Sequence, residues 1–195
     1  MKKLLSILLC ALLLSSCNDS SREKLKETIA SIDTGDKLKT ININKYSIGI
    51  PDYMEKMTDL NDEASLQYGD KFKEFYVIVI DETHGSVDSA FSEGGYTDSL
   101  GDPELFNALY KLMKESYTSG VKDVRNIKER DFSISGMPAK ELTFNGTLDT
   151  YDVYYNVSFV KGPTQFFQVF TWTMGKYKEK YEPTMHNMIN SLHEI

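Results

Sequence analysis

The spacing of apolar residues changes along the chain between a two-residue period and a helical period, and this change predicts where strands and helices lie. Tyr46, Ile48 and Ile50 alternate with other residues, and Pro51 ends the run because proline cannot donate to a strand ladder. Segment 73–82, KEFYVIVIDE, instead carries an unbroken apolar run. Such a run is typical of a strand that is buried on both faces.

The same criteria predict further strands. We expect two short strands within 36–54, one at 64–70, two that meet at a turn near 136–138, and two within 151–175 that are joined at 161–163. The predicted turns contain glycine or proline, which often connect antiparallel strands.

Segment 101–120 predicts a helix with well-marked ends. Asp102 is a suitable N-cap, Pro103 occupies the first helical position, and Gly120 ends the run. The helix has one apolar face, made by Leu105, Leu109, Leu112, Met113 and Tyr117.

A second helix is predicted over 176–195. Pro183 is expected to split or kink it, because proline removes a helical hydrogen bond. The inner face of this helix holds Met185, Met188, Ile189 and Leu192.

Segment 151–175 is rich in aromatic residues and nearly free of charge. Its second strand places apolar side chains on both faces, with Phe166, Phe170 and Trp172 on one and Phe167 and Val169 on the other. A strand of this kind needs cover on both sides of its sheet. We therefore expect an α+β fold in which an antiparallel sheet is covered by helices on both faces, an α/β/α sandwich, with Trp172 in the core.

Composition and charge narrow the range of partners. The chain has 195 residues, with 29 acidic and 22 basic side chains and a formal net charge of −7. Nucleic-acid binding requires a basic surface, so we expect no nucleic acid among the partners. Both cysteines, Cys10 and Cys17, lie near the N-terminus, so the rest of the chain has no thiol for a disulfide or a metal site.

The N-terminal segment has the pattern of a lipoprotein leader. Lys2 and Lys3 precede an apolar run over 4–14, which is shorter than the roughly 20 residues that a transmembrane helix needs. The sequence LSSC at 14–17 resembles the lipobox of bacterial lipoproteins, which implies cleavage before Cys17 and attachment of lipid to its sulfur. We expect a lipoprotein signal peptide at 1–16, a tether at 17–36 and a domain at 37–195. The lipid on Cys17 would hold the protein on a membrane of the bacterial cell envelope.

No group of side chains indicates a catalytic reaction. The chain has no nucleophile motif with a recognisable base. One acidic cluster offers a single nitrogen ligand, so we expect neither a metal nor another cofactor; this cluster comprises Asp81, Glu82, His84 and Asp88.

A long loop is predicted between residues 83 and 100. Long loops in compact domains often carry function. We expect a partner-binding site there, with His84, Asp88 and Tyr96 as its candidate contacts.

Short motifs in the chain resemble the PsbP-like domain family. The resemblance covers about 37–195 and is carried by YSIGIPDYM at 46–54, GMPAKELTF at 136–144, QFFQVFTWTMG at 165–175, and MINSL at 188–192. It implies an α/β/α sandwich and a mainly non-catalytic role, with partners that differ from one member to another. We therefore expect a lipid-anchored, non-catalytic binding or assembly module of the bacterial cell envelope, with an envelope protein as its partner. Two alternatives remain open: a carrier of an apolar ligand, and an enzyme that uses carboxylates such as Asp81 and Glu82.

Overall fold

The computed structural model describes residues 36–95 and 103–195, which belong to one compact unit. The predicted signal peptide, tether and lipidated Cys17 lie outside the described residues. The elements run in the order β1 (Leu38–Ile43), β2 (Tyr46–Pro51), β3 (Glu55–Lys56), β4 (Leu66–Asp70), β5 (Phe75–Thr83), α2 (His84–Glu93), α3 (Pro103–Ser119), β6 (Lys122–Ile134), β7 (Met137–Leu148), β8 (Tyr151–Lys161), β9 (Gln165–Met174), η1 (Gly175–Tyr177), α4 (Lys178–Asn190) and β10 (His193–Glu194).

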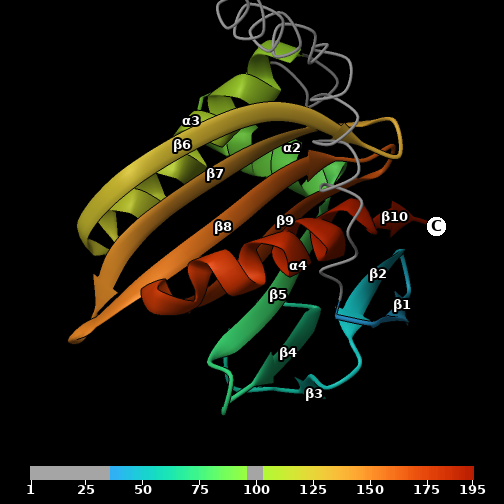
Figure 1. The fold of residues 1–195 in the computed structure, drawn as a ribbon. Helices are drawn as coiled ribbons and strands as arrows, with labels where there is room; N and C mark the ends of the chain where they lie inside the picture. The colour runs from blue at the N-terminus through green and yellow to red at the C-terminus, as the bar shows by residue number, and fades with distance from the viewer. Residues whose placement is uncertain (1–35, 96–102) are drawn as a thin grey trace, which may run out of the picture. The chain divides into compact units, whose positions relative to one another are not determined.

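The strands form two sheets (Figure 1). A seven-stranded sheet has the order β3-β4-β5-β9-β8-β7-β6, and a three-stranded sheet has the order β1-β2-β10. Every described pair of strands is antiparallel. The predicted α+β class with antiparallel sheets is therefore confirmed. The aromatic strand β9 lies between β5 and β8, in the interior of the large sheet.

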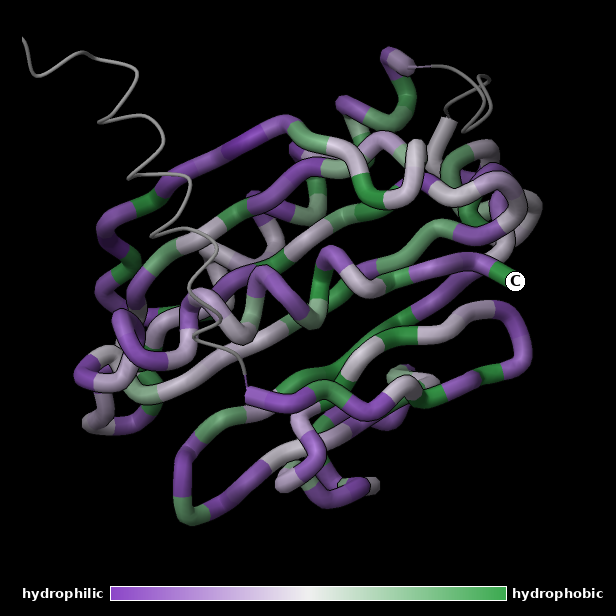
Figure 2. Tube along the Cα trace, turned by 45° about the vertical axis from the view of Figure 1, so that its right-hand side comes forward, coloured by the Kyte–Doolittle hydropathy of each residue, from purple (hydrophilic) through white to green (hydrophobic). Residues whose placement is uncertain are grey.

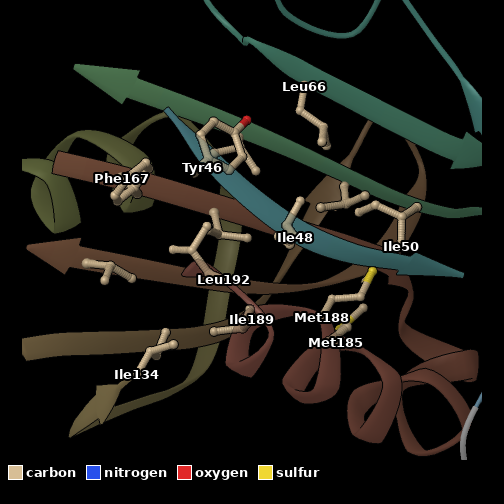
Figure 3. Close-up of a cluster of buried hydrophobic side chains, with 14 of the residues drawn as sticks. Tyr46, Ile48, Ile50, Leu66, Ile134, Phe167, Met185, Met188, Ile189 and Leu192 are labelled. Atoms are coloured by element: carbon tan, nitrogen blue, oxygen red, sulfur yellow. The ribbon is translucent and has the colours of Figure 1, made fainter. Parts of the chain in front are cut away.

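One hydrophobic cluster joins β2, α4 and one face of the large sheet. Figure 3 shows side chains of β2 gathered with those of the C-terminal segment in this cluster, with Tyr46 near Phe167. The alternation of Tyr46, Ile48 and Ile50 explains this arrangement, since all three side chains are fully buried. They pack with Met185, Met188, Ile189, Leu192, Phe167 and Val169.

A second cluster joins α2 and α3 to the opposite face of β7, β8 and β9. Strand alternation separates the two clusters, because neighbouring residues of β9 point to opposite sides of the sheet. Phe166 belongs to this second cluster, whereas Phe167 belongs to the first. The helical side of the cluster is formed by Val87, Phe91, Leu105, Phe106, Leu109 and Tyr110.

Several predictions about the helices are wrong in detail. Residues 84–93 form α2 instead of part of a loop, since Thr83 caps a helix by accepting a hydrogen bond from the Ser86 amide. Leu112 is 44% exposed, and the buried face of α3 uses Phe106 and Tyr110 instead. Pro183 lies inside α4, which runs without a break from Lys178 to Asn190, so the helix is not split there.

Strand β6 forms one edge of the large sheet and is irregular. Its pairing with β7 shifts register twice, between Lys122 and Arg125 and between Arg125 and Lys128. Asp123 and Asn126 have positive φ angles of 50° and 56° at these shifts. Figure 2 shows hydrophobic residues concentrated in the interior of the domain and hydrophilic residues along its outer segments.

Candidate functional site

The face of the large sheet that carries the second cluster is hollowed along β5 and β9. Two neighbouring depressions lie there, with volumes of about 380 Å³ and about 620 Å³. They share the same two strands, because Tyr76 and Trp172 line one depression and Ile78 and Phe170, two residues away on each strand, line the other. We refer to the two depressions together as the β5–β9 groove.

The smaller depression is mainly apolar. Its floor is formed by Tyr76 and Trp172, which face each other in the β5–β9 register and stack with their ring centroids 5.3 Å apart. Its walls come from the segment after β3, the turn between β4 and β5, and the β7–β8 hairpin. They include the apolar residues Met57, Leu60, Leu148, Tyr151 and Val153 and the charged residues Asp59, Lys71 and Glu74.

The strand pattern predicts that Trp172 lies in the core, and this prediction is wrong. The indole is partly exposed and belongs to neither hydrophobic cluster. Its neighbours Thr171 and Thr173 are buried on the other face of β9, at 0% and 1% exposure. The predicted alternation holds along β9, but the helices of the second cluster do not cover the end of the strand that holds the indole.

Exposed apolar side chains surround this end of the groove. Leu148 and Tyr151 are 55% and 58% exposed. Phe72, in the turn between β4 and β5, is 100% exposed and lines an adjoining depression with Lys71. Large apolar side chains that gather at one exposed place mark interaction surfaces on soluble domains.

Gly69 on β4 fits closely beneath the smaller depression. A Cβ atom at this position would come within 2.5 Å of Cδ1 of Tyr76 and 2.7 Å of the sulfur of Met57. Glycine therefore lets the Tyr76 ring lie against the β4 backbone, where it supports the indole of Trp172.

The larger depression combines an apolar floor with polar walls. Ile78, Ile80 and Phe170 form the floor, and α3 contributes Met113 and Tyr117. The Tyr117 hydroxyl donates to Oε1 of Gln168 at 2.5 Å. Burial raises the pKa of Tyr117 to about 12, and the charges of Glu63 and Glu82 act in the same direction. Tyr117 is therefore a neutral hydrogen-bond donor at physiological pH.

Three acidic residues, Glu63, Asp81 and Glu82, line the larger depression. Burial raises the pKa of Glu82 above its ordinary value, and the negative charges of Glu63 and Asp81 raise it further. No ion pair of the described residues includes any of these three carboxylates.

Two of the predicted partner-binding residues, His84 and Asp88, do not line the β5–β9 groove. His84 begins α2, and its backbone amide donates to the Thr164 carbonyl at 3.2 Å. It lines a separate depression together with the turns at 135–138 and 161–163. Asp88 lies within α2, and Tyr96 lies outside the described residues. Whether these three residues contact a partner stays a prediction.

Asp81 and Glu82, which the sequence analysis names in its acidic cluster, both line the groove.

Within residues 36–95 and 103–195, no three histidine, cysteine or acidic side chains are grouped so that they could hold a metal ion. No helix in those same ranges combines the length and apolarity needed to cross a membrane.

A second polar cluster lies on the opposite face of the sheet, beneath α4. The carboxylate of Glu141 accepts hydrogen bonds from Arg130 and from Asn156, at 3.1 Å and 3.2 Å. Nε2 of His186 on α4 lies 3.1 Å from the same carboxylate oxygen. Burial favours the neutral acid, but the contacts with His186, Asn156 and Arg130 outweigh it and hold the pKa of Glu141 below its ordinary value. This cluster fastens α4 to β7 and β8.

The groove could not be found from the sequence, because its existence depends on where the helices end over the sheet. The strand pattern of Trp172 and Tyr76 is that of core residues, and only the extent of α3 decides whether such side chains are covered. Two signals were available: Trp172 is the single tryptophan of the chain, and Gly69 interrupts the predicted strand at 64–70.

Comparison with known proteins identifies the fold. No protein-family model and no curated protein matches the chain. Among solved structures, the cyanobacterial PsbP (CyanoP) of Synechocystis sp. PCC 6803 aligns with a TM-score of 0.55 at 10% identity, over 83% of this chain and 94% of CyanoP. LpqN of Mycobacterium tuberculosis, a protein involved in cell envelope biogenesis, aligns with a TM-score of 0.53 at 8% identity, over 81% of this chain and 90% of LpqN. The resemblance in the sequence motifs is thus confirmed at the level of structure, and the chain has the PsbP-like fold.

Proposed function

We propose that the protein is a lipid-anchored, non-catalytic binding module of the bacterial cell envelope, and that it holds a segment of a partner protein in the β5–β9 groove. The observation that carries this proposal is the open aromatic end of the groove. Trp172 and Tyr76 form its floor, and exposed Leu148 and Tyr151 stand beside it. Tryptophan and tyrosine are the side chains that contribute most to protein interfaces.

The proposed location in the envelope has two supports. The leader with LSSC at 14–17 has the pattern of a lipoprotein signal. LpqN, which has a similar fold, is involved in cell envelope biogenesis. A fold is shared by proteins of different function, so the groove rather than the fold indicates what this chain binds.

In this proposal the large sheet is closed by helices on both faces except at the groove. The cluster with α4 and the cluster with α2 and α3 support this arrangement as an α/β/α sandwich. The partner would then reach the sheet only where β5 and β9 are uncovered, at one defined place.

Site-specific photocrosslinking in living cells tests the proposal. A benzoylphenylalanine residue is placed at Tyr151 beside the groove, and at Glu179, which is exposed on α4, as the control. We expect one envelope protein to be crosslinked from position 151, and expect this product to be lost when Trp172→Ala is added. Equal products from both positions, or no product from position 151, would contradict the proposal.

The apolar depression also favours a second candidate, a carrier of an apolar ligand. The depression of about 380 Å³ is of a size that small ligands occupy. Native mass spectrometry of protein purified from membranes checks this candidate. A bound lipid or other apolar molecule that is absent from the Trp172→Ala variant would support it, and an unliganded mass would count against it.

A further inference from the structure

The larger depression of the β5–β9 groove holds negative charge that nothing in the described fold neutralises. Glu63 and Glu82 both line this depression, together with Tyr117. Neither carboxylate forms an ion pair with a described residue. We call this part the acidic end, in contrast to the aromatic end at Tyr76 and Trp172.

A buried amide also lines the acidic end. Gln168 is 3% exposed, and its Oε1 accepts the hydrogen bond from Tyr117. Gln168 lines the depression, and its amide nitrogen is a hydrogen-bond donor that a ligand entering the depression could use.

The floor between the two ends is apolar. Ile78, Ile80 and Phe170 separate the carboxylates from the Tyr76–Trp172 pair. A small hydrated cation would gain nothing from such a floor, and the described residues offer no group of ligands for a metal ion. The ligand that matches the groove has a positive charge at one end and apolar groups along the rest.

We propose that the β5–β9 groove binds an extended segment of a partner protein that places a lysine or arginine at Glu63 and Glu82 and apolar side chains against Phe170 and Trp172. This inference rests on the proposed function and names the chemistry of the bound segment. The side-chain amide of Gln168 would bond to a carbonyl of the segment.

The dimensions of the groove fit such a segment. From Tyr76 to Glu82 the strand advances by six residue steps of about 3.3 Å, so the groove runs for about 20 Å. A chain of six extended residues has the same length. Its alternate side chains would face the floor, so three of them would contact the protein.

Trp172 provides a direct measurement, because it is the only tryptophan in the chain and lies in the groove. The probe is a blocked hexapeptide, acetyl-Lys-Ser-Leu-Ser-Leu-Ser-amide, which carries lysine and two leucines on one side when extended. We expect it to change the Trp172 emission in a saturable way. A second peptide with glutamate in place of lysine should bind at least about tenfold more weakly, because like charges then meet at the acidic end.

Charge variants of the protein complete the test. Glu63→Gln combined with Glu82→Gln should weaken the lysine peptide roughly tenfold and leave a peptide with serine in place of lysine unaffected. The control combines Glu93→Gln with Glu179→Gln, which removes the same charge from exposed positions on α2 and α4. This control should bind the lysine peptide as the unaltered protein does.

Three outcomes would overturn the inference: no effect of the lysine peptide on Trp172, equal affinity for the lysine and glutamate peptides, or equal loss in the groove and control variants. These outcomes are distinguishable from failure of the proposed function. If crosslinking from position 151 still captures an envelope protein in a Trp172-dependent way, the groove binds a partner, and only the cationic character assigned to the bound segment is wrong.

Discussion

Tyr76 of β5 and Trp172 of β9 stack across the strand pair, with their ring planes inclined by 19° and their ring centroids 5.3 Å apart. Both rings remain partly exposed, in a sheet whose other large aromatic side chains are mostly buried. An aromatic pair that lies beside solvent in a groove provides a preformed contact surface for a ligand.

Replacing Trp172 should affect binding more than stability. We expect Trp172→Ala to lower the free energy of unfolding by about 1–2 kcal/mol, which reflects the lost stacking and a partly exposed ring. Phe167→Ala is the matched comparison, because Phe167 is fully buried on the same strand, and should cost about 3–5 kcal/mol. Urea denaturation followed by circular dichroism measures both values. Equal losses would show that Trp172 is part of the core.

Gly69 should be needed for the shape of the groove. Gly69→Ala introduces a Cβ that meets the Tyr76 ring, so we expect a loss of about 1–3 kcal/mol and a shift in Trp172 emission. The control is Gly85→Ala in α2, where an added Cβ meets no atom within 4 Å. That substitution should keep the emission unchanged and leave stability equal or slightly higher, because alanine favours a helix. An unchanged emission spectrum for Gly69→Ala would contradict this account of Tyr76.

Glu82 should reduce the stability of the unbound protein at neutral pH. Its pKa is raised in the native state by burial and by Glu63 and Asp81, so ionisation is less favourable there than in the unfolded chain. The destabilisation begins as the pH rises through 4.5, the ordinary pKa of a glutamate. It is complete once the pH exceeds the raised pKa of Glu82 in the native state. Glu82→Gln should therefore raise the melting temperature at pH 7. The gain should disappear well below pH 4.5, and thermal melts across this range check it.

Glu141 should have the opposite effect. The pKa of Glu141 is lowered in the native state. Its carboxylate therefore stabilises the fold when the pH is above 4.5, the ordinary pKa of a glutamate. This contribution is lost as the pH falls through the lower pKa of the native state. Glu141→Gln should cost about 2 kcal/mol at pH 7, because it weakens bonds to a charged acceptor beneath α4. The difference from the unaltered protein should narrow in acid. Glu115→Gln, an exposed residue on α3, serves as the control and should show no such trend. A pH-independent loss in Glu141→Gln would point to packing instead of charge.

The proposed anchor is tested by Cys17→Ser. Without the thiol no lipid can be attached, so we expect the protein to move from the membrane fraction to the soluble fraction. Cys10→Ser leaves the proposed attachment site intact and should remain with membranes. Immunoblots of separated fractions measure the distribution. Membrane retention of the Cys17 variant would show that another part of the protein holds it there.

The periodic elements could be predicted from the sequence because burial imposes their spacing. The strand around Ile48, the apolar run of β5 and the helix from Pro103 agree with the structure for this reason. The helix α2 was missed because its start depends on a single cap at Thr83, and its two buried positions, Val87 and Phe91, form too short an apolar pattern.

The groove could not be predicted in the same way. Whether Trp172 is core or surface depends on where α3 ends over the sheet, which is a property of three-dimensional packing and not of strand alternation. The charge of the acidic end likewise depends on how close Glu63 lies to Glu82. The two residues are distant in sequence, and the β4–β5 pairing brings them near each other. Asp81 and Glu82 were recognised as acids, but their shared surroundings were not.

The edge strand β6 has a consequence if the proposed lipid anchor concentrates the protein on a membrane. An unpaired strand edge is a template on which a second copy can add, and crowding at a membrane would favour this. The two register shifts, at Arg125 and Lys128, interrupt the straight row of free backbone groups, and alternating charges follow them along Lys128 to Asp131. These features make the β6 edge a poor template for the addition of a second copy.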